Sequence, residues 1–191
     1  YGVFSPINRL HCSCEATCTK EPWAYGNGAG EIAKKWLRLR HQLIPYIYTA
    51  SYLTHTEGRA LVEPLYNEWK CDKAYEYRRE YLFGSQLLVA PVYSKTGKCG
   101  FAKVKAWLPE GNWTDIFTGA KYCVGKGGKE VVLHREMESI PVFIKEGGIL
   151  PLSLNEGNGA ENPKVMQVNV YEGNGEYTLY EDGFEQEKQG K

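Results

Sequence analysis

The sequence of 191 residues lacks the features that mark several specialised classes of protein. Its 23 basic and 23 acidic side chains cancel, so no excess charge points to a nucleic acid or an anionic membrane as partner. No run of about 20 apolar residues could form a membrane-spanning helix. With six cysteines, the chain is too large and too poor in cysteine to be a small disulfide-stabilised scaffold. We therefore expect neither a nucleic-acid partner nor a membrane partner.

The cysteines are unevenly placed. Cys12, Cys14 and Cys18 crowd next to His11, which raises the question of a zinc site. Structural zinc sites usually combine two closely spaced ligand pairs, and this chain offers no second pair. We therefore expect no metal and no cofactor, and the reduced thiols of a cytoplasmic protein. A Cys/His metal or redox domain is the alternative, which zinc content and a free-thiol count would test.

The apolar residues predict one long helix after a loop. Glycines and prolines interrupt residues 1–30 and favour a loop there. From Glu31 to Glu57, apolar residues recur at intervals of three and four. Pro45 lies inside this pattern and must kink or split the helix, because proline has no amide N–H to donate. Gly58 is placed to end the helix.

Beyond this helix the sequence is typical of β-structure, with short apolar segments between turn residues about every 8–12 positions. The expected strands are residues 60–66, 87–92, 102–108, 113–117, 130–134, 140–145 and 149–152. Residues 67–79 form a polar connector. Residues 155–163 have the composition of a linker, and the segments 165–171 and 177–180 predict a hairpin around Gly-Asn-Gly.

Several motifs follow one another in a recognisable order. They are Phe4-Ser-Pro-Ile-Asn-Arg-Leu-His11, Lys20-Glu-Pro-Trp23, Leu43-Ile-Pro-Tyr-Ile-Tyr48, Leu87-Leu-Val-Ala-Pro-Val92, Pro141-Val-Phe-Ile-Lys145 and Tyr177-Thr-Leu-Tyr-Glu-Asp-Gly183. In this order they resemble glycoside hydrolase family 31, the α-glucosidases, α-xylosidases and their relatives, over residues 2–183. No single motif is decisive, and their ordered occurrence carries the resemblance. Glu63 departs from the family pattern, which often has arginine there, so no ion pair is carried over at that position.

The resemblance implies an α+β fragment that holds the last part of a (β/α)8 barrel, an antiparallel β-sandwich and the start of a second β-domain. Residues 1–66 would be the end of the catalytic barrel, residues 67–154 the proximal sandwich, and residues 155–191 a linker and the beginning of the distal β-domain. The partner would be the missing N-terminal part of the same enzyme. Without it, residues 31–66 would be poorly packed or would pair with another copy in a homo-oligomer.

The resemblance also implies a set of substrate contacts. The family histidine that matches His11 lies against the hydroxyls of the sugar being cleaved. Arg9 would lie nearby, either in contact with the site or in support of it. Trp23 would stack on a sugar face or wedge the loop. We expect Glu21 to make an ion pair in the loop or a contact at the approach to the helix.

No catalytic residue is expected within the chain. Retaining glycosidases use two carboxyl groups about 5–5.5 Å apart, and in family 31 both are aspartates that lie upstream of the segment matching residues 1–11. The three aspartates here, Asp72, Asp115 and Asp182, have no matching context, so we expect structural or solvent roles for them.

The function implied by the resemblance is therefore that of a C-terminal portion. The parent enzyme would be a retaining α-glycosidase that removes terminal α-linked glucose or xylose from oligosaccharides, and this chain alone would be inactive. The alternative is a non-catalytic carbohydrate-binding β-module that uses its 14 tyrosines and 5 tryptophans. Such a module would bind maltose or starch by itself.

Overall fold

The computed structural model describes residues 2–11, 19–155 and 161–183. The helices of these residues are η1 (Gly2–Phe4), η2 (Pro22–Tyr25), α1 (Gly26–Gln42), α2 (Ile44–Glu57), α3 (Leu65–Glu68) and α4 (Asp72–Glu76). The strands are β1 (Val62–Pro64), β2 (Tyr81–Phe83), β3 (Leu87–Val89), β4 (Ala102–Leu108), β5 (Gly111–Asp115), β6 (Lys121–Val124), β7 (Lys129–Arg135), β8 (Val142–Lys145), β9 (Ile149–Ser153) and β10 (Met166–Val170).

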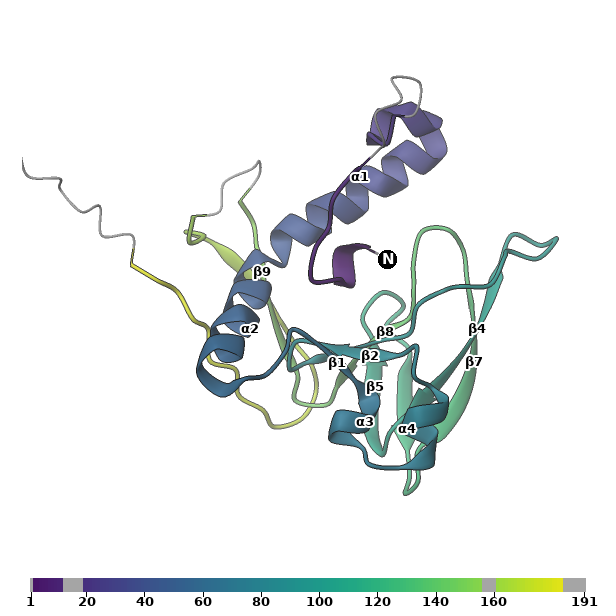
Figure 1. The fold of residues 1–191 in the computed structure, drawn as a ribbon, viewed down its shortest axis with the longest axis vertical. Helices are drawn as coiled ribbons and strands as arrows, with labels where there is room; N and C mark the ends of the chain where they lie inside the picture. The colour runs from purple at the N-terminus through teal and green to yellow at the C-terminus, as the bar shows by residue number, and fades with distance from the viewer. Residues whose placement is uncertain (1, 12–18, 156–160, 184–191) are drawn as a thin grey trace, which may run out of the picture.

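The strands form three antiparallel sheets. The largest has six strands in the order β1-β2-β3-β8-β5-β6, and the pairs β4-β7 and β9-β10 form the other two. Every strand pair within the described residues is antiparallel, which confirms the expected sheet type. In Figure 1, α1 extends away from the sheets, α2 lies beside β9, and α3 and α4 lie at the opposite end of the molecule. No helix in the described parts is long and apolar enough to cross a membrane.

The long helix predicted from the apolar pattern is split in two. α1 and α2 meet at Leu43, and Pro45 lies in the first turn of α2. The N–H groups of a first turn have no acceptor within the helix, so proline there costs no hydrogen bond. Gly58 ends α2 in the left-handed conformation, with φ of 72° and its N–H 3.1 Å from the Thr54 carbonyl oxygen. The split at proline and the stop at glycine are both confirmed.

The start of the helix differs from the prediction. α1 begins at Gly26 rather than Glu31, and η1 and η2 add further helical turns to the region expected to be a loop. Gly30 explains the difference, because a Cβ atom there would lie 2.6 Å from the Pro22 carbonyl oxygen. The glycine therefore allows η2 to pack against α1, a tertiary contact that local glycine propensity does not reveal.

The predicted strands agree with the structure over most of residues 102–152. β4 has the predicted bounds, and β5, β7, β8 and β9 differ from prediction by a few residues at their ends. The first strand is shorter than expected because Leu65 begins α3, and the polar connector carries α4. β6 was not predicted, since among its four residues only Val124 is buried and the strand is short.

The predicted C-terminal hairpin is wrong. β10 pairs with β9, and residues 177–180 form no strand. Instead, the ring of Tyr177 stacks on Tyr46 with 6.0 Å between centroids, and the ring of Tyr180 stacks on Tyr52 at 3.8 Å. The Tyr180 N–H also donates to Thr49 Oγ1 at 3.0 Å. Residues 177–180 therefore pack on α2 instead of pairing with β10.

Two hydrophobic clusters hold these elements together. One joins the N-terminal segment and both long helices to one side of the large sheet, and the other lies between that sheet and β4-β7 with α3 and α4. Leu43, Tyr46 and Leu65 are at most 1% exposed. These three positions of the range 31–66 are therefore well packed, whereas Gly30 is the only buried residue among those of α1, and pairing with another copy stays a prediction.

Candidate functional site

The N-terminal segment is anchored by one arginine from α1. Arg40 Nη1 donates to the carbonyl oxygens of Val3 and Ser5, both at 2.6 Å, and Nη2 donates to that of Pro6 at 3.1 Å. The hydroxyl of Tyr81 donates to the Phe4 carbonyl oxygen at 2.5 Å. Burial lowers the pKa of Arg40 from its usual value, and the guanidinium remains charged at neutral pH. These bonds fix the backbone that continues to Arg9 and His11.

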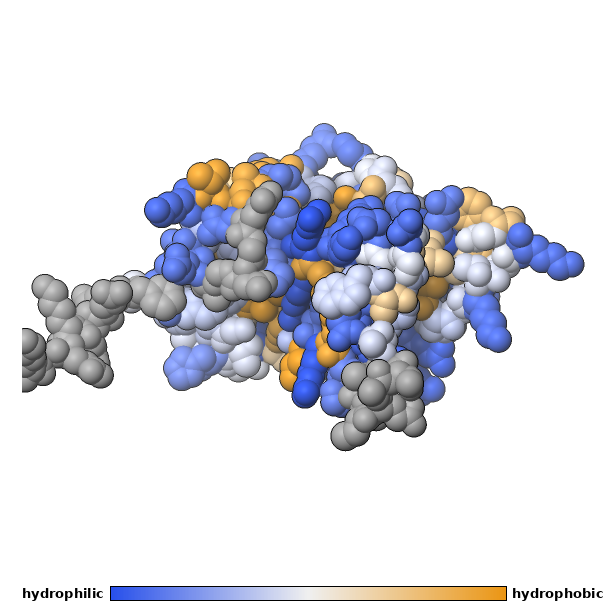
Figure 2. Space-filling view, turned by 90° about the horizontal axis from the view of Figure 1, so that it is seen from above, coloured by the Kyte–Doolittle hydropathy of each residue, from blue (hydrophilic) through white to orange (hydrophobic). Residues whose placement is uncertain are grey.

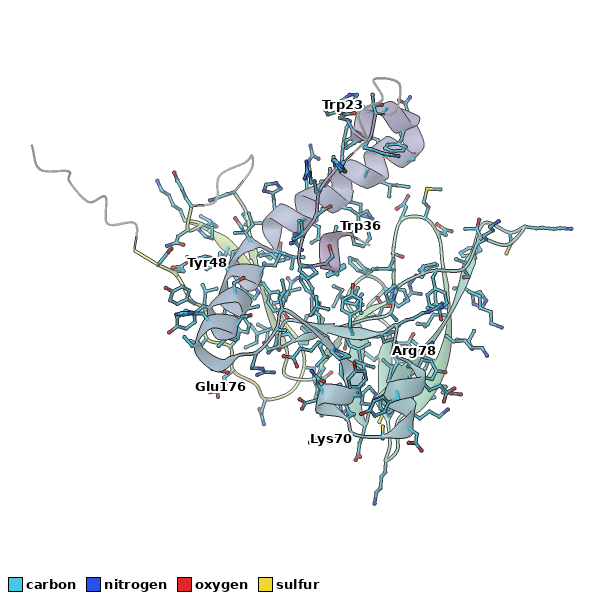
Figure 3. All side chains as sticks on the ribbon, viewed as in Figure 1. Trp23, Trp36, Tyr48, Lys70, Arg78 and Glu176 are labelled. Atoms are coloured by element: carbon cyan, nitrogen blue, oxygen red, sulfur yellow. The ribbon has the colours of Figure 1, made fainter. Side chains whose placement is uncertain are left out.

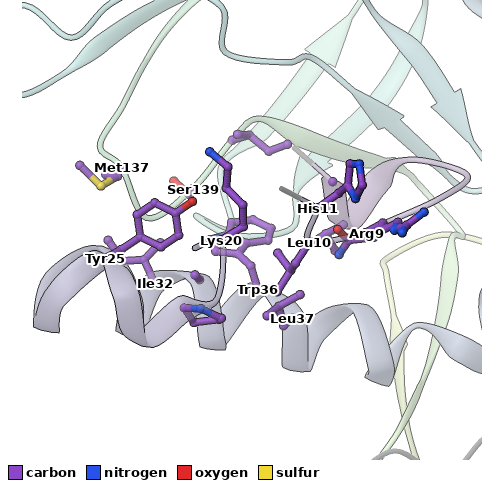
Figure 4. Close-up of a pocket in the computed structure, with 16 residues that line it drawn as sticks. Arg9, Leu10, His11, Lys20, Tyr25, Ile32, Trp36, Leu37, Met137 and Ser139 are labelled. Atoms are coloured by element: carbon purple, nitrogen blue, oxygen red, sulfur yellow. The ribbon is translucent and has the colours of Figure 1, made fainter. Parts of the chain in front are cut away.

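Arg9 and His11 line a pocket with a volume of about 410 Å³, which we call the His11 hollow. Figure 4 shows Arg9 and His11 at one end, Tyr25 and Met137 at the other, and Lys20 between them. α1 lines the base of the hollow, and the loop between β7 and β8 supplies the wall that includes Met137. Three segments distant in sequence therefore converge here.

The hollow combines apolar surface with hydrogen-bond donors. Tyr25 is 50% exposed and Met137 is 68% exposed, so both present accessible apolar surface. In the view of Figure 2, hydrophobic residues reach the surface in patches among hydrophilic ones. Arg9 and Lys20 add positive charge, and His11 can donate or accept a hydrogen bond. Such a combination suits a sugar, which has apolar faces and many hydroxyls.

The sequence-predicted substrate residues fall into two groups. Arg9 and His11 line the same hollow, and both side chains are exposed. Trp23 does not line the hollow and is 75% exposed near the start of α1, as Figure 3 shows. The aromatic rings at the hollow are those of Tyr25, two residues later, and Trp36 on α1. The roles of all three residues stay predictions.

No acidic side chain lines the His11 hollow within the described part of the chain. Asp115 is fully buried against Arg135 and accepts the N–H groups of Phe117 and Thr118 at 3.0 and 3.2 Å. Asp182 accepts the Tyr48 hydroxyl at 2.5 Å.

The remaining acidic candidates are also placed by the structure. Asp72 is exposed at the start of α4, so all three aspartates have the structural or solvent positions expected for them. Glu21 makes no ion pair within the described residues, and its Oε2 is buried without a partner. Glu21 lies directly before η2, and its side chain makes no capping hydrogen bond there.

Sequence reasoning missed part of the hollow. The ring of Trp36, one of the recurring apolar residues of the helix, contacts Phe4 and Phe117 edge-on, at centroid distances of 6.1 and 5.0 Å. The same side chain also lines the hollow. Lys20 and Tyr25 flank Trp23 in a motif that could have suggested them. Nothing in the sequence places the β7–β8 loop there.

The cysteines divide into two sets of three. Cys12, Cys14 and Cys18 lie outside the described residues. Cys71, Cys99 and Cys123 are free and exposed. Among the residues that the structure describes, no group of three His, Cys, Asp or Glu side chains is arranged to hold a metal ion.

Two family models match consecutive parts of the chain. Residues 1–50 match the TIM-barrel domain of glycosyl hydrolases family 31, and residues 58–150 match the glycosyl hydrolase family 31 C-terminal domain. The order of these matches is the order of the motifs in the sequence. The chain therefore belongs to glycosyl hydrolase family 31, which confirms the resemblance.

Curated relatives include an alpha-glucosidase and an alpha-xylosidase. Alpha-glucosidase 2 of Bacillus thermoamyloliquefaciens is 32% identical over 95% of this chain and 22% of its own length. The alpha-xylosidase of Saccharolobus solfataricus is 32% identical over 95% of this chain and 24% of its own. The chain thus spans less than a quarter of the length of either relative.

Solved structures agree with the family. The cycloalternan-forming enzyme from Listeria monocytogenes, in complex with a pentasaccharide substrate, aligns with a TM-score of 0.81 and 27% identity over 94% of this chain and 18% of its own. A family 31 alpha-xylosidase from Xanthomonas citri aligns with a TM-score of 0.77 and 28% identity over 94% of this chain and 19% of its own.

Proposed function

We propose that this chain is the C-terminal portion of a retaining α-glycosidase that hydrolyses terminal α-linked glucose or xylose from oligosaccharides. Residues 1–66 would close the catalytic barrel, residues 67–154 would form the proximal β-sandwich, and residues 155–191 would lead into a distal β-domain. The order of the two family matches, residues 1–50 and then residues 58–150, supports the order of a barrel end followed by a C-terminal domain. The relatives named as alpha-glucosidase and alpha-xylosidase support the two substrate classes.

The observation that carries the proposal is the composition of the His11 hollow. It offers His11, Arg9 and an aromatic ring, but no carboxylate within the described residues. His11 would exchange hydrogen bonds with hydroxyls of the cleaved sugar, and Arg9 would contact or support the site. Trp23 would contribute from the neighbouring turn. The hollow would then be one wall of a sugar site whose carboxylates come from elsewhere.

The complete enzyme would act by double displacement. One aspartate would attack the anomeric carbon while a second protonated the leaving oxygen, and water would then cleave the glycosyl-enzyme. Barrel active sites are built from loops at the carboxyl ends of several strands. A chain that holds one such segment lacks the groups for either chemical step, so its part in the reaction would be to bind and orient the sugar.

The 191-residue chain alone is expected to show no glycosidase activity. The purified chain would be incubated with p-nitrophenyl α-glucoside and p-nitrophenyl α-xyloside, and release of p-nitrophenol would be followed by absorbance. The rate should equal that of buffer, because no pair of carboxyl groups lies at the hollow within the residues that the structure describes. Hydrolysis that the His11→Ala variant loses would overturn the proposed division of the active site.

Replacement of His11 by alanine is expected to weaken binding of glucose to the chain by about tenfold, the effect of one lost hydrogen bond of about 1–1.5 kcal/mol. Saturation-transfer NMR with glucose and xylose would measure this change. His55→Ala is the matched control, because His55 is an exposed histidine on α2 that does not line the hollow. If glucose bound equally well to the wild type and the His11→Ala variant, the proposed site would be wrong and a separate carbohydrate-binding module would be favoured.

A further inference from the structure

A second concave site lies between α4, the turn after this helix, and the β4-β7 sheet. This site, which we call the Glu80 groove, has a volume of about 540 Å³ and shares no lining residue with the His11 hollow. Figure 3 shows Arg78 beside α4, well separated from Trp23 near the start of α1. The groove is therefore a separate feature of the molecule, and a ligand bound there would be independent of the proposed function.

Glu80 contributes a buried carboxyl group with one unused oxygen. The residue is 3% exposed, and its Oε1 accepts the backbone N–H of Trp107 at 2.9 Å. Its Oε2 is buried and has no hydrogen-bond partner among the described residues. Burial raises the pKa of Glu80 to about 9, so the carboxyl is neutral at pH 7. A neutral carboxyl carries an O–H donor, and here no acceptor from the described chain meets it.

The groove also holds basic side chains that no carboxylate pairs with. Arg78, Arg79 and Lys105 line it, and none forms an ion pair within the described parts of the chain. The guanidinium carbon of Arg79 lies 4.2 Å from the centroid of the Tyr93 ring. This cation–π contact orients the guanidinium before any ligand arrives.

The acidic groups of the groove are already engaged. Lys73 Nζ lies 2.8 Å from Glu76 Oε2 and 2.7 Å from Glu130 Oε1. The Tyr77 hydroxyl also donates to Glu130 Oε1 at 2.8 Å. Lys73 balances the charge of one of these two carboxylates, and the three remaining basic side chains outnumber the other carboxylate. The groove therefore has more free donors than acceptors and a positive charge.

We propose that the Glu80 groove binds the phosphate group of a small molecule, either free phosphate or a phosphate monoester. A phosphate supplies only acceptor oxygens, which match the forked donors of Arg78 and Arg79. The ammonium of Lys105 adds a third positive group at the same groove. A neutral sugar would leave the arginine charges unmatched and is the less suitable occupant.

The test is a calorimetric titration of the 191-residue chain at pH 7 with three probes: inorganic phosphate, glucose 6-phosphate and glucose. Both phosphate compounds are expected to bind at one site that glucose does not occupy. Tighter binding of glucose 6-phosphate would identify a monoester as the natural ligand, and equal binding would identify free phosphate.

The double variant Arg78→Gln/Arg79→Gln is expected to bind phosphate at least about tenfold more weakly, because two charge-assisted contacts are lost. Arg38→Gln, an exposed arginine on α1 outside the groove, is the matched control and should bind as the wild type does. Glu80→Gln leaves the basic side chains of the groove in place and should retain binding, because the carboxyl oxygens of Glu80 are not needed to contact the phosphate. Absence of phosphate binding at millimolar concentration, or an equal loss in the Arg38→Gln control, would overturn the proposal.

Discussion

Asp115→Ala is expected to lower the free energy of unfolding by about 3–5 kcal/mol, because it removes one partner of a buried ion pair. Asp115 is fully buried and Arg135 is 8% exposed. The variant would leave the Arg135 guanidinium without its carboxylate, and the N–H groups of Phe117 and Thr118 without their acceptor. Urea unfolding, followed by tryptophan fluorescence, would measure the loss.

Two further variants separate charge from hydrogen bonding. Asp115→Asn keeps an acceptor oxygen for the two backbone N–H groups but loses the charge, so its loss of stability should be smaller. Lys121→Ala removes an exposed ion pair with Glu172 at 2.6 Å and should leave the free energy of unfolding nearly unchanged. A cost for Asp115→Ala as small as that of Lys121→Ala would contradict the structural role assigned to this pair.

Glu80→Gln is expected to stabilise the protein at neutral pH, and the gain should increase with pH. Burial raises the folded-state pKa of Glu80 to about 9, against an ordinary value of 4.5. Between these values the unfolded chain releases a proton that the folded chain keeps, so stability falls by about 1.4 kcal/mol per pH unit. The cost reaches roughly 3 kcal/mol at pH 7. Glutamine escapes this cost because it does not titrate, and it can still accept the Trp107 N–H.

The measurement is urea unfolding of the wild type and the variant at several pH values from 4 to 9. The two proteins should be nearly equal at pH 4, where glutamate is protonated in both the folded and the unfolded state. Glu76→Gln is the matched control, since Glu76 is an exposed glutamate of α4 that pairs with Lys73. Its effect should be small and should not grow with pH. A stability difference for Glu80→Gln that is constant across this range would refute the raised pKa.

Proline and glycine account for much of what could be predicted about the fold. Pro45 and Gly58 divide and end the long helix through covalent and steric restrictions that act wherever the residues stand. Likewise, alternation of buried and exposed residues over residues 102–106 of β4 and 130–135 of β7 follows from the period of a strand. Gly30 was wrongly taken as a loop residue. Its role is to leave room for the Pro22 carbonyl group, a contact that the local sequence does not show.

The site was predictable only as far as its sequence motif extends. Arg9 and His11 stand two residues apart in a segment that carries the family resemblance, and the structure brings both to one hollow. The role of Arg40 in anchoring that segment could not be predicted. Its position in an amphipathic helix does not indicate that it donates to the Val3 and Ser5 carbonyl oxygens. The separation of Trp23 from the hollow likewise depends on how η2 turns against α1.

The sequence by itself determined the family, the order of its parts, the division of the long helix and the placement of Arg9 and His11 in one motif. These properties follow from short-range conformational restrictions and from residue patterns that are visible in the sequence itself. Only the tertiary structure decided that Lys20 and Met137 line the same hollow, and that the buried Glu80 lines one groove with Arg78 and Arg79. Such features arise because packing brings together residues far apart in the chain, and burial then changes the chemistry of the groups it encloses.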